Sequence, residues 1–229
     1  MTEEPQLSVL IPVFNEESTI ERVVRAVAAI PIRHEIVVVD DGSQDGTPQI
    51  LARLEAEGLI RVFRQSNQGK GAAVRRGIAE ARGSICVIQD ADLEYQPEDF
   101  PLLIKPIVEM GADAVYGSRF MGPHRVFLFW HYSANRFLTL VTNVLYDTML
   151  TDMETGYKAV RTSVLRDLRL RSTTFDIEPE ITAKLFKRGH KVFEVPITYN
   201  GRTYAEGKKI RAKDGILALV ALIRFRFSD

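Results

Sequence analysis

Short apolar runs alternate with longer amphipathic segments along the first half of the chain. Five runs rich in β-branched residues predict strands at 7–13, 35–39, 60–63, 84–89 and 112–116. The segments between them repeat apolar residues at helical spacing or open with proline, and predict helices at 17–30, 48–57, 72–81 and 97–110. Strands that alternate with helices in this way favour an α/β fold with a mostly parallel central sheet flanked by helices on both faces.

The second half of the chain is less regular. Its apolar spacing predicts one or two helices over 126–149 and single helices at 178–188 and 213–227. A strand is predicted at 191–199, where Pro196 indicates an edge position because proline has no backbone N–H to donate. A loop dense in lysine and arginine, 199–213, joins this strand to the last helix, which is either amphipathic or buried.

The composition indicates a globular protein of one domain, with 229 residues of which 45% are hydrophobic and 26% charged. The 30 lysines and arginines balance 30 acidic residues, so the net charge does not indicate a nucleic-acid partner. Cys86 is the single cysteine and lies in an apolar run. It cannot form an internal disulfide, and its free thiol fits a reducing compartment such as the cytoplasm.

Neither end of the chain predicts a segment that spans a membrane. The acidic start, 1–5, is not followed by the apolar segment of a signal peptide. The longest apolar stretch, 215–227, is interrupted by Arg224 and Arg226. It is shorter than the roughly 20 apolar residues that a transmembrane helix needs. We therefore expect a protein that does not cross a membrane but is still able to lie on the surface of one.

The predicted strand 84–89 ends in two carboxylates, Asp90 and Asp92, separated by Ala91. Unpaired charges beside apolar surface are strongly disfavoured, so a cation is expected to meet them. Mg²⁺ or Mn²⁺ carrying a diphosphate fits this position, because such hard cations take carboxylate and phosphate oxygens as ligands. Asp92 is the first candidate ligand, with Asp90 or Glu94 assisting. The alternative interpretation is a solvated acidic loop before a helix.

A second acidic strand end follows the run 35–39. Asp45 and Thr47 fit the capping of a helix, but capping does not explain Asp40 and Asp41 at the tip of the strand. Their carboxylates suit the N–H groups of a nucleobase and the hydroxyls of a ribose, as does Glu16 beyond the first strand. Ligands bind at the carboxyl ends of the strands in open α/β sheets, so we expect one nucleotide site there.

Four further residues are candidates for the chemistry. Lys70 stands between two glycines before a predicted helix, a reasonable anion site although the Walker A pattern is absent. Arg119 follows the fifth predicted strand and is able to bind a diphosphate through two hydrogen bonds, with a surface salt bridge as the alternative. Asp152 and Glu154 are the best remaining acids, and capping of a helix by Asp152 is an equally good interpretation.

These segments together resemble the family-2 glycosyltransferases, and within them the polyprenyl-phosphate (dolichol-phosphate) mannose or glucose synthases. The resemblance covers nearly the whole chain and is carried, in the family's order, by Ile11-Pro12-Val13-Phe14-Asn15-Glu16, the segment 40–47, Gly69-Lys70-Gly71, Asp90-Ala91-Asp92-Leu93, Gly117-Ser118-Arg119 and the segment 152–158. It implies a single GT-A domain over 1–229, a nucleotide-sugar donor, a divalent metal, and transfer with inversion. The half 1–118 would bind the nucleotide sugar, and the half 119–229 the acceptor.

The resemblance also implies roles for individual residues. The nucleotide sugar would contact Pro12, Phe14, Glu16, Asp40, Asp41, Lys70, Asp90 and Ala91. The catalytic residues would be Asp92, Arg119 and Asp152, and the metal ligands Asp92, Glu94 and Asp90. The acceptor or its phosphate would meet Arg119, Arg136, Arg202, Lys208 and Lys209. Two departures stand out: Glu94 occupies a position where this group often has glutamine, and the basic C-terminal loop lacks the group's serine.

Between 119 and 136 basic residues interleave with aromatic ones. Arg119, Arg125 and Arg136 flank Phe127-Leu128-Phe129-Trp130, and the segment contains no acid. This pattern is typical of a segment at a membrane interface, where rings lie at headgroup depth and arginines meet phosphates. The alternative interpretation is an ordinary core helix.

The interfacial interpretation favours a lipid acceptor. We expect transfer of mannose or glucose from GDP-mannose or UDP-glucose to a polyprenyl phosphate at the cytosolic face of a membrane, with the protein bound peripherally. A separate membrane-anchoring subunit is compatible with this. Two alternatives stay open: transfer to a soluble or saccharide acceptor, which would require Asp152 as general base, and a non-catalytic nucleotide-sugar-binding partner protein.

Overall fold

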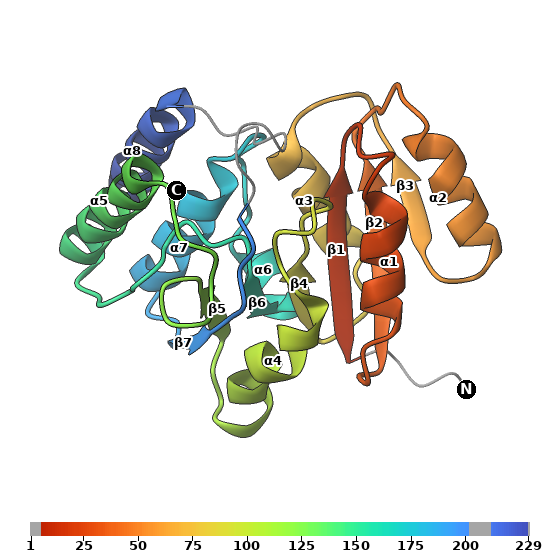
Figure 1. Ribbon diagram of the computed structural model, residues 1–229. Coiled ribbons are helices and arrows are strands. Elements are labelled where there is room, and N and C mark those ends of the chain that lie inside the picture. The colour runs from red at the N-terminus through yellow and green to blue at the C-terminus, as the bar shows by residue number, and fades with distance from the viewer. Residues whose placement is uncertain (1–5, 202–211, 229) are drawn as a thin grey trace.

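A mixed sheet with helices on both faces forms the body of the protein (Figure 1). The computed structural model describes residues 6–201 and 212–228. The strands are β1 (Leu7–Val13), β2 (His34–Asp40), β3 (Arg61–Arg64), β4 (Ile85–Ile88), β5 (Ala114–Ser118), β6 (Lys158–Arg161) and β7 (Val192–Pro196). The helices are α1 (Ile20–Ala28), α2 (Thr47–Ala56), α3 (Lys70–Glu80), α4 (Phe100–Glu109) with the short 3-10 helix η1 (Pro97–Asp99) before it, α5 (Phe129–Tyr146), α6 (Thr162–Asp167), α7 (Ile177–Lys187) and α8 (Ala212–Phe227).

The seven strands found in the described residues have the order β3-β2-β1-β4-β6-β5-β7. All neighbouring pairs are parallel except those of β6, which runs antiparallel to both β4 and β5. The predicted α/β fold with a mostly parallel sheet is therefore confirmed. Because β6 runs against its neighbours, the segment 152–157 before it lies at the carboxyl ends of β4 and β5. The reversal thus brings a sixth loop to the edge where ligands bind.

Successive residues of the central strands face opposite layers of the core. In β1, Val9 and Ile11 belong to the core layer that includes residues of α1, α2 and α4, whereas Leu10 belongs to the opposite layer, with residues of α3, α6 and α7. Both layers exclude water from the strand, which explains why β1 and β4 are continuous apolar runs rather than alternating ones. Cys86 lies within the second layer, fully buried.

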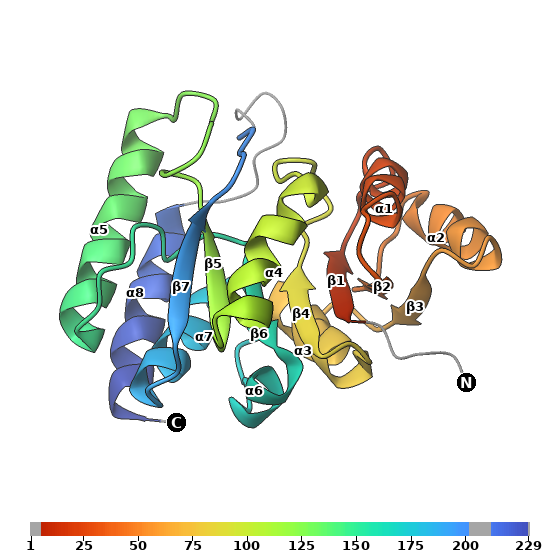
Figure 2. The same ribbon diagram turned by 90° about the horizontal axis from the view of Figure 1, so that it is seen from below.

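Helices α5 and α8 lie side by side at the β7 end of the sheet, as both views show (Figures 1 and 2). The hydroxyl of Tyr146 in α5 donates to the carbonyl of Leu222 in α8 over 2.7 Å, and α8 packs in turn on α7. The segment 126–149 thus forms one helix, preceded by an extended stretch. Within the described parts of the chain, no helix is both long enough and apolar enough to cross a membrane.

Candidate active site at the carboxyl edge of the sheet

The two acidic strand ends predicted from the sequence lie at one edge of the sheet. Asp40 ends β2 opposite Val13 of β1, and the backbone N–H of Asp41 donates to the Val13 carbonyl over 2.9 Å. On the other side of β1, the N–H of Gln89 donates to the Leu10 carbonyl over 2.9 Å, which brings the end of β4 to the same edge. The structure therefore places the 40–41 and 90–92 carboxylates in one site region.

Asp40 and Asp41 are both buried but have different partners. The Asp41 carboxylate accepts the backbone N–H groups of Gln68 and Gly69 over 2.9 and 2.7 Å, and so holds the loop before α3. The Asp40 carboxylate accepts the N–H of Ser43 over 2.9 Å, within its own turn. Asp41 is thus committed largely to the loop, and Asp40 is the better placed of the two for a nucleobase.

The loops after β1 and β2 are hydrogen bonded into a single rim. The Asn15 N–H donates to Ser43 Oγ over 2.9 Å, and the Asn15 side chain accepts the N–H of Gln44 over 2.8 Å. Phe14 on this rim exposes 39% of its surface, which offers a flat face for a base to stack on. Glu16 faces Thr19, whose hydroxyl donates to its carboxylate over 3.0 Å. Pro12 lies in β1 just below the rim, half-buried.

Lys70, the first residue of α3, carries its ammonium into the acidic region. Its Nζ lies 2.7 Å from Asp90 Oδ1 and 3.6 Å from Glu178 Oε1 of α7. Burial alone would lower the pKa of Lys70, but the carboxylates of Asp90, Glu178 and Asp92 together raise it. The charged form of Lys70 is therefore favoured, and its ammonium pairs with the strand-end carboxylate of Asp90.

Gly69 is required where the loop enters α3. Its φ of +98° is a conformation that residues with a side chain rarely adopt. A Cβ at this position would also collide with the carbonyl oxygen of Thr173, since the segment 172–174 crosses directly over the start of the helix. The glycines around Lys70 thus serve close packing of two backbones, and this packing fixes the position of the ammonium.

The predicted metal ligands do not form a complete cluster. Glu94 is directed to Tyr199, whose hydroxyl donates to Glu94 Oε2 over 2.6 Å, and its N–H donates to Asp92 Oδ1 over 3.2 Å. Among the residues that the structure describes, no group of three or more acidic, histidine or cysteine side chains is arranged to hold a metal ion. The role of Glu94 as a metal ligand therefore stays a prediction. The hard oxygens of Asp90 and Asp92 still fit Mg²⁺ or Mn²⁺, provided that the diphosphate supplies further ligands.

Arg119 and Asp152 form a buried pair joined by three hydrogen bonds. Arg119 Nε and Nη2 donate to the two carboxylate oxygens of Asp152, each over 2.7 Å, and the Arg119 backbone N–H donates over 3.0 Å. Burial alone would lower the pKa of Arg119, but Asp152 raises it well above its usual value. Asp152 is fully buried and both of its oxygens are engaged. Asp152 thus orients Arg119 in this structure, and its role as general base stays a prediction.

The pair leaves one side of the guanidinium for a ligand. No hydrogen bond of Arg119 Nη1 is found among residues 6–201 and 212–228, and the group lies over the ring of Tyr199, 5.3 Å from its centroid. Because the carboxylate fixes the plane of the guanidinium, its outer N–H groups have a set direction. Arg119 is therefore a rigid cation beside the acidic strand ends, well suited to an anion such as phosphate.

Several residues of the site could not be found from the sequence. Glu178 of α7 joins Lys70 to Lys158 of β6, whose Nζ lies 2.6 Å from Glu178 Oε2. No sequence motif marks Tyr95. Its hydroxyl nevertheless accepts the N–H of Gly156 over 2.8 Å, and its ring stacks on Tyr157. Lys158 and Tyr157 at least belong to a segment that the motifs singled out, whereas nothing marks Glu178 among the acids of its helix.

The basic and aromatic segment ends in the first turn of α5, where its aromatic side chains are exposed, and the interfacial interpretation stays a prediction. Phe129 and Trp130 expose 69% and 79% of their surfaces. Arg136 points back toward the site, where its guanidinium donates to the Thr151 carbonyl over 3.1 Å. The other predicted phosphate contacts, Arg202, Lys208 and Lys209, lie outside the described residues.

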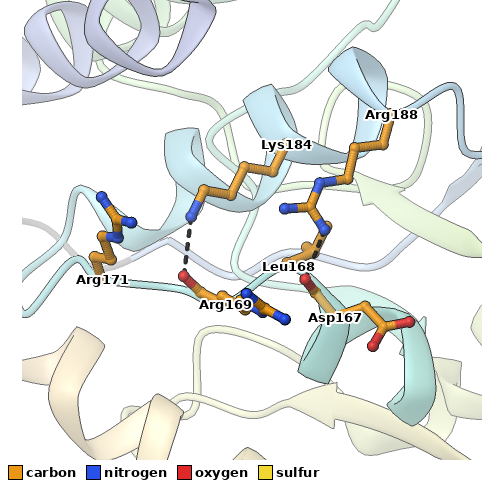
Figure 3. Close-up of a pocket in the computed structure, with 6 residues that line it drawn as sticks. All are labelled: Asp167, Leu168, Arg169, Arg171, Lys184 and Arg188. Atoms are coloured by element: carbon orange, nitrogen blue, oxygen red, sulfur yellow. Dashed lines mark hydrogen bonds between the residues drawn. The ribbon is translucent and has the colours of Figure 1, made fainter. Parts of the chain in front are cut away.

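A separate pocket of about 420 Å³ lies between the end of α6 and α7 (Figure 3). It is lined by Asp167, Leu168, Arg169, Arg171, Lys184 and Arg188. Lys184 Nζ donates to the Arg169 carbonyl over 3.0 Å, and Arg188 Nη1 donates to the Asp167 carbonyl over 2.6 Å. Both cationic side chains therefore also stabilise the wall of the pocket. None of the predicted site residues lines this pocket.

Comparison with known proteins identifies the family of the chain. The family described as glycosyl transferase family 2 matches residues 8–169. The dolichol-phosphate mannosyltransferase of Pyrococcus furiosus is 32% identical over 210 residues, covering 89% of this chain and 59% of that protein. The dodecaprenyl-phosphate galacturonate synthase of Rhizobium johnstonii is 30% identical over 213 residues, covering 89% of this chain and 61% of that protein. The chain thus spans about three fifths of the length of these two relatives.

Solved structures with the same fold include the glucosyl-3-phosphoglycerate synthase of Mycobacterium tuberculosis in complex with Mn²⁺, uridine diphosphate and phosphoglyceric acid. It matches with a TM-score of 0.76 at 21% identity, covering 98% of this chain and 80% of that chain. At this level of identity the likeness concerns the fold, and it confirms the expected GT-A architecture.

Proposed function

The chain belongs to glycosyl transferase family 2, and on that premise we propose that it transfers a hexose from a nucleotide sugar to a polyprenyl phosphate. The observation that carries the choice of acceptor is the Arg119–Asp152 pair. It would present a fixed cation, and Asp152, with both oxygens engaged by Arg119, would be poorly placed to act as a base. A phosphate acceptor is already an anion at neutral pH and needs a cation rather than a base.

The donor would bind along the rim of the strands. Asp40 would accept hydrogen bonds from the nucleobase, and the exposed ring of Phe14 would stack on it. Glu16 would lie at the ribose. The diphosphate would then reach the end of β4, where Asp90 and Asp92 lie near the ammonium of Lys70.

Asp90 and Asp92 would hold Mg²⁺ or Mn²⁺ together with the diphosphate. When bound, such a cation supplies positive charge that stabilises the leaving nucleoside diphosphate. Lys70 now balances Asp90, and Glu178 lies within 3.6 Å as an alternative partner for its ammonium. We therefore expect Lys70 to leave Asp90 for the diphosphate when the donor binds, with Glu178 restraining it.

The acceptor phosphate would lie on the outer N–H groups of Arg119, with Arg136 close by. Attack from this side, opposite the diphosphate, would invert the configuration of the anomeric carbon. Arg119 would bind the incoming phosphate, and Asp152 would keep the guanidinium in its plane.

The lipid part of the acceptor is supported by the exposed apolar surface next to Arg136. Phe129 and Trp130 stand at the start of α5, and Leu140 and Val144 continue along its outer face with exposures of 59% and 75%. Such a surface beside arginines suits the headgroup region of a membrane. We propose that the protein lies on the cytosolic face through this surface.

A soluble phosphorylated acceptor is the second candidate. The same observation supports it, because Arg119 would bind a phosphate whether or not a lipid is attached. The solved structure named above contains phosphoglyceric acid, a soluble phosphorylated compound.

The test is a transfer assay with radiolabelled UDP-glucose and GDP-mannose, each offered polyprenyl phosphate in detergent with Mg²⁺ or Mn²⁺. We expect label in the organic phase from one donor, and loss of it in Asp92→Asn, with UDP or GDP binding retained in the absence of metal. Glu94→Gln is the matched control and should keep its activity. Donor binding without transfer to any phosphate would contradict the proposal.

A further inference from the structure

Glu154 lies on the segment that joins the two halves of the site. Asp152, two residues before it, binds Arg119, and Gly156, two residues after it, lies against Asp90. A Cβ at Gly156 would come within 2.9 Å of Asp90 Oδ2. The segment therefore spans the distance between the proposed diphosphate site and the proposed acceptor cation.

One oxygen of the Glu154 carboxylate lacks a partner in this position. Its Oε1 atom is buried and forms no hydrogen bond in the described structure. Burial raises the pKa of Glu154 to about 7, an effect that Lys158 and Arg119 reduce and that Glu178 and Asp152 increase. A buried acceptor without a donor is unfavourable, and in native structures it calls for an explanation such as a ligand.

Neither of the two neighbouring cations donates a hydrogen bond to Glu154 Oε1. The ammonium of Lys158 has three N–H groups, and it donates to the carbonyls of Met153 and Thr155 and to Glu178. Arg119 is held by Asp152 through two of its nitrogens. Glu154 thus lies near charged groups whose hydrogen bonds go to other residues, and its Oε1 atom has no donor.

We propose that Glu154 Oε1 accepts a hydrogen bond from a hydroxyl group of the transferred sugar and so contributes to the selection of the donor. The inference rests on the proposed function. The bond that breaks joins the sugar to the diphosphate at Asp90, and the acceptor arrives at Arg119. The sugar must therefore lie between them, above the segment that carries Glu154. A hexose supplies the hydroxyl donors that this oxygen lacks.

The same oxygen is able to accept a hydrogen bond from the hydroxyl of an acceptor molecule instead. If the acceptor were an alcohol, Glu154 would receive its proton and act as general base. The two sources differ in what they require: a sugar hydroxyl changes the binding of the donor, whereas an acceptor hydroxyl changes only the rate of transfer. Binding of the nucleotide sugar, compared with binding of the nucleoside diphosphate, therefore separates them.

The experiment is calorimetry of UDP-glucose, GDP-mannose, UDP and GDP with Mn²⁺ on the wild-type protein, Glu154→Met and Glu154→Gln. Methionine keeps the length of the side chain but accepts only weak hydrogen bonds, whereas glutamine keeps an amide oxygen. We expect Glu154→Met to bind the preferred nucleotide sugar roughly 10- to 100-fold more weakly, as for a lost hydrogen bond to a charged group. Binding of the matching nucleoside diphosphate should change less than about twofold, and Glu154→Gln should recover part of the loss.

Unchanged binding of the nucleoside diphosphate also shows that the variants fold. Equal weakening of nucleotide and nucleotide sugar would overturn the assignment, because the side chain would then act on the structure of the site. Unchanged donor binding with a large loss of kcat toward an alcohol would overturn it in favour of a general base. If the wild-type protein bound neither nucleotide sugar, the proposed function itself would fail, and the assignment with it.

Discussion

Loss of the carboxylate in Asp152→Asn should destabilise the protein strongly, because Arg119 would remain as a buried cation without a counter-charge. Asp152 is fully buried, the Arg119 side chain is 9% exposed, and two hydrogen bonds of 2.7 Å join them. Asparagine retains the shape but turns an amide N–H₂ toward a guanidinium that is itself only a donor. Removal of one partner from a buried ion pair costs about 3–5 kcal/mol, a large share of the roughly 5–15 kcal/mol that stabilises a typical domain.

The assay is urea unfolding followed by far-ultraviolet circular dichroism. Fluorescence is a poor probe here, because Trp130 is the only tryptophan and is 79% exposed. The matched control is Glu109→Gln, which breaks an exposed pair with Lys105 and should change the free energy of unfolding by less than about 0.5 kcal/mol. A double-mutant cycle with Arg119→Met should give a coupling energy of at least about 2 kcal/mol. A cost below about 1 kcal/mol for Asp152→Asn, or additive losses in the cycle, would refute the reasoning.

Three further predictions follow from the same contacts. Gly69→Ala should cost more than about 2 kcal/mol of stability and Gly58→Ala only about 1 kcal/mol, since both have positive φ but a Cβ meets nothing within 4 Å at Gly58; equal melting temperatures would count against the close crossing of backbones at Gly69. Glu154 holds a proton in the native state from pH 4.5 to about 7 that the unfolded chain has released, so stability should fall as pH rises through this window. Glu154→Gln should therefore gain stability relative to wild type, by up to about 3 kcal/mol between pH 4 and pH 8, and a constant difference in unfolding free energy across this range would argue against a raised pKa. Glutamate at Phe129 and Trp130 should weaken sedimentation with anionic vesicles at least about tenfold, and unchanged binding would exclude this surface as the membrane contact.

The alternation of strands and helices in the first half was predictable because both faces of the parallel strands are buried. Such strands appear as continuous apolar runs, and their helices repeat at helical spacing. The strand β6 was missed because it is short and has a basic residue at each end, Lys158 and Arg161. Lys158 is buried only because Glu178 of a later helix balances its charge. A pairing between residues so far apart leaves no local pattern in the sequence.

The candidate site divides in the same way. Asp40, Asp90 and Asp92 stand where strands end, so strand prediction and the parallel topology together place them at one edge. The partner of a given charge was not predictable: the sequence suggested a general base or a helix cap for Asp152, and in the structure its carboxylate binds Arg119. Glu94 was predicted to be a metal ligand, and in the structure its carboxylate accepts a hydrogen bond from the Tyr199 hydroxyl. Local sequence thus indicates which charges meet at the site but not how they pair.

The central claim is that Arg119 receives an anionic acceptor. The most direct measurement offers the wild-type protein polyprenyl phosphate and the corresponding polyprenol side by side, with the same labelled nucleotide sugar and metal. The account predicts label on the phosphate only, with transfer lost by at least about 100-fold in Arg119→Met. Transfer to the alcohol at a comparable rate, insensitive to Arg119, would contradict it.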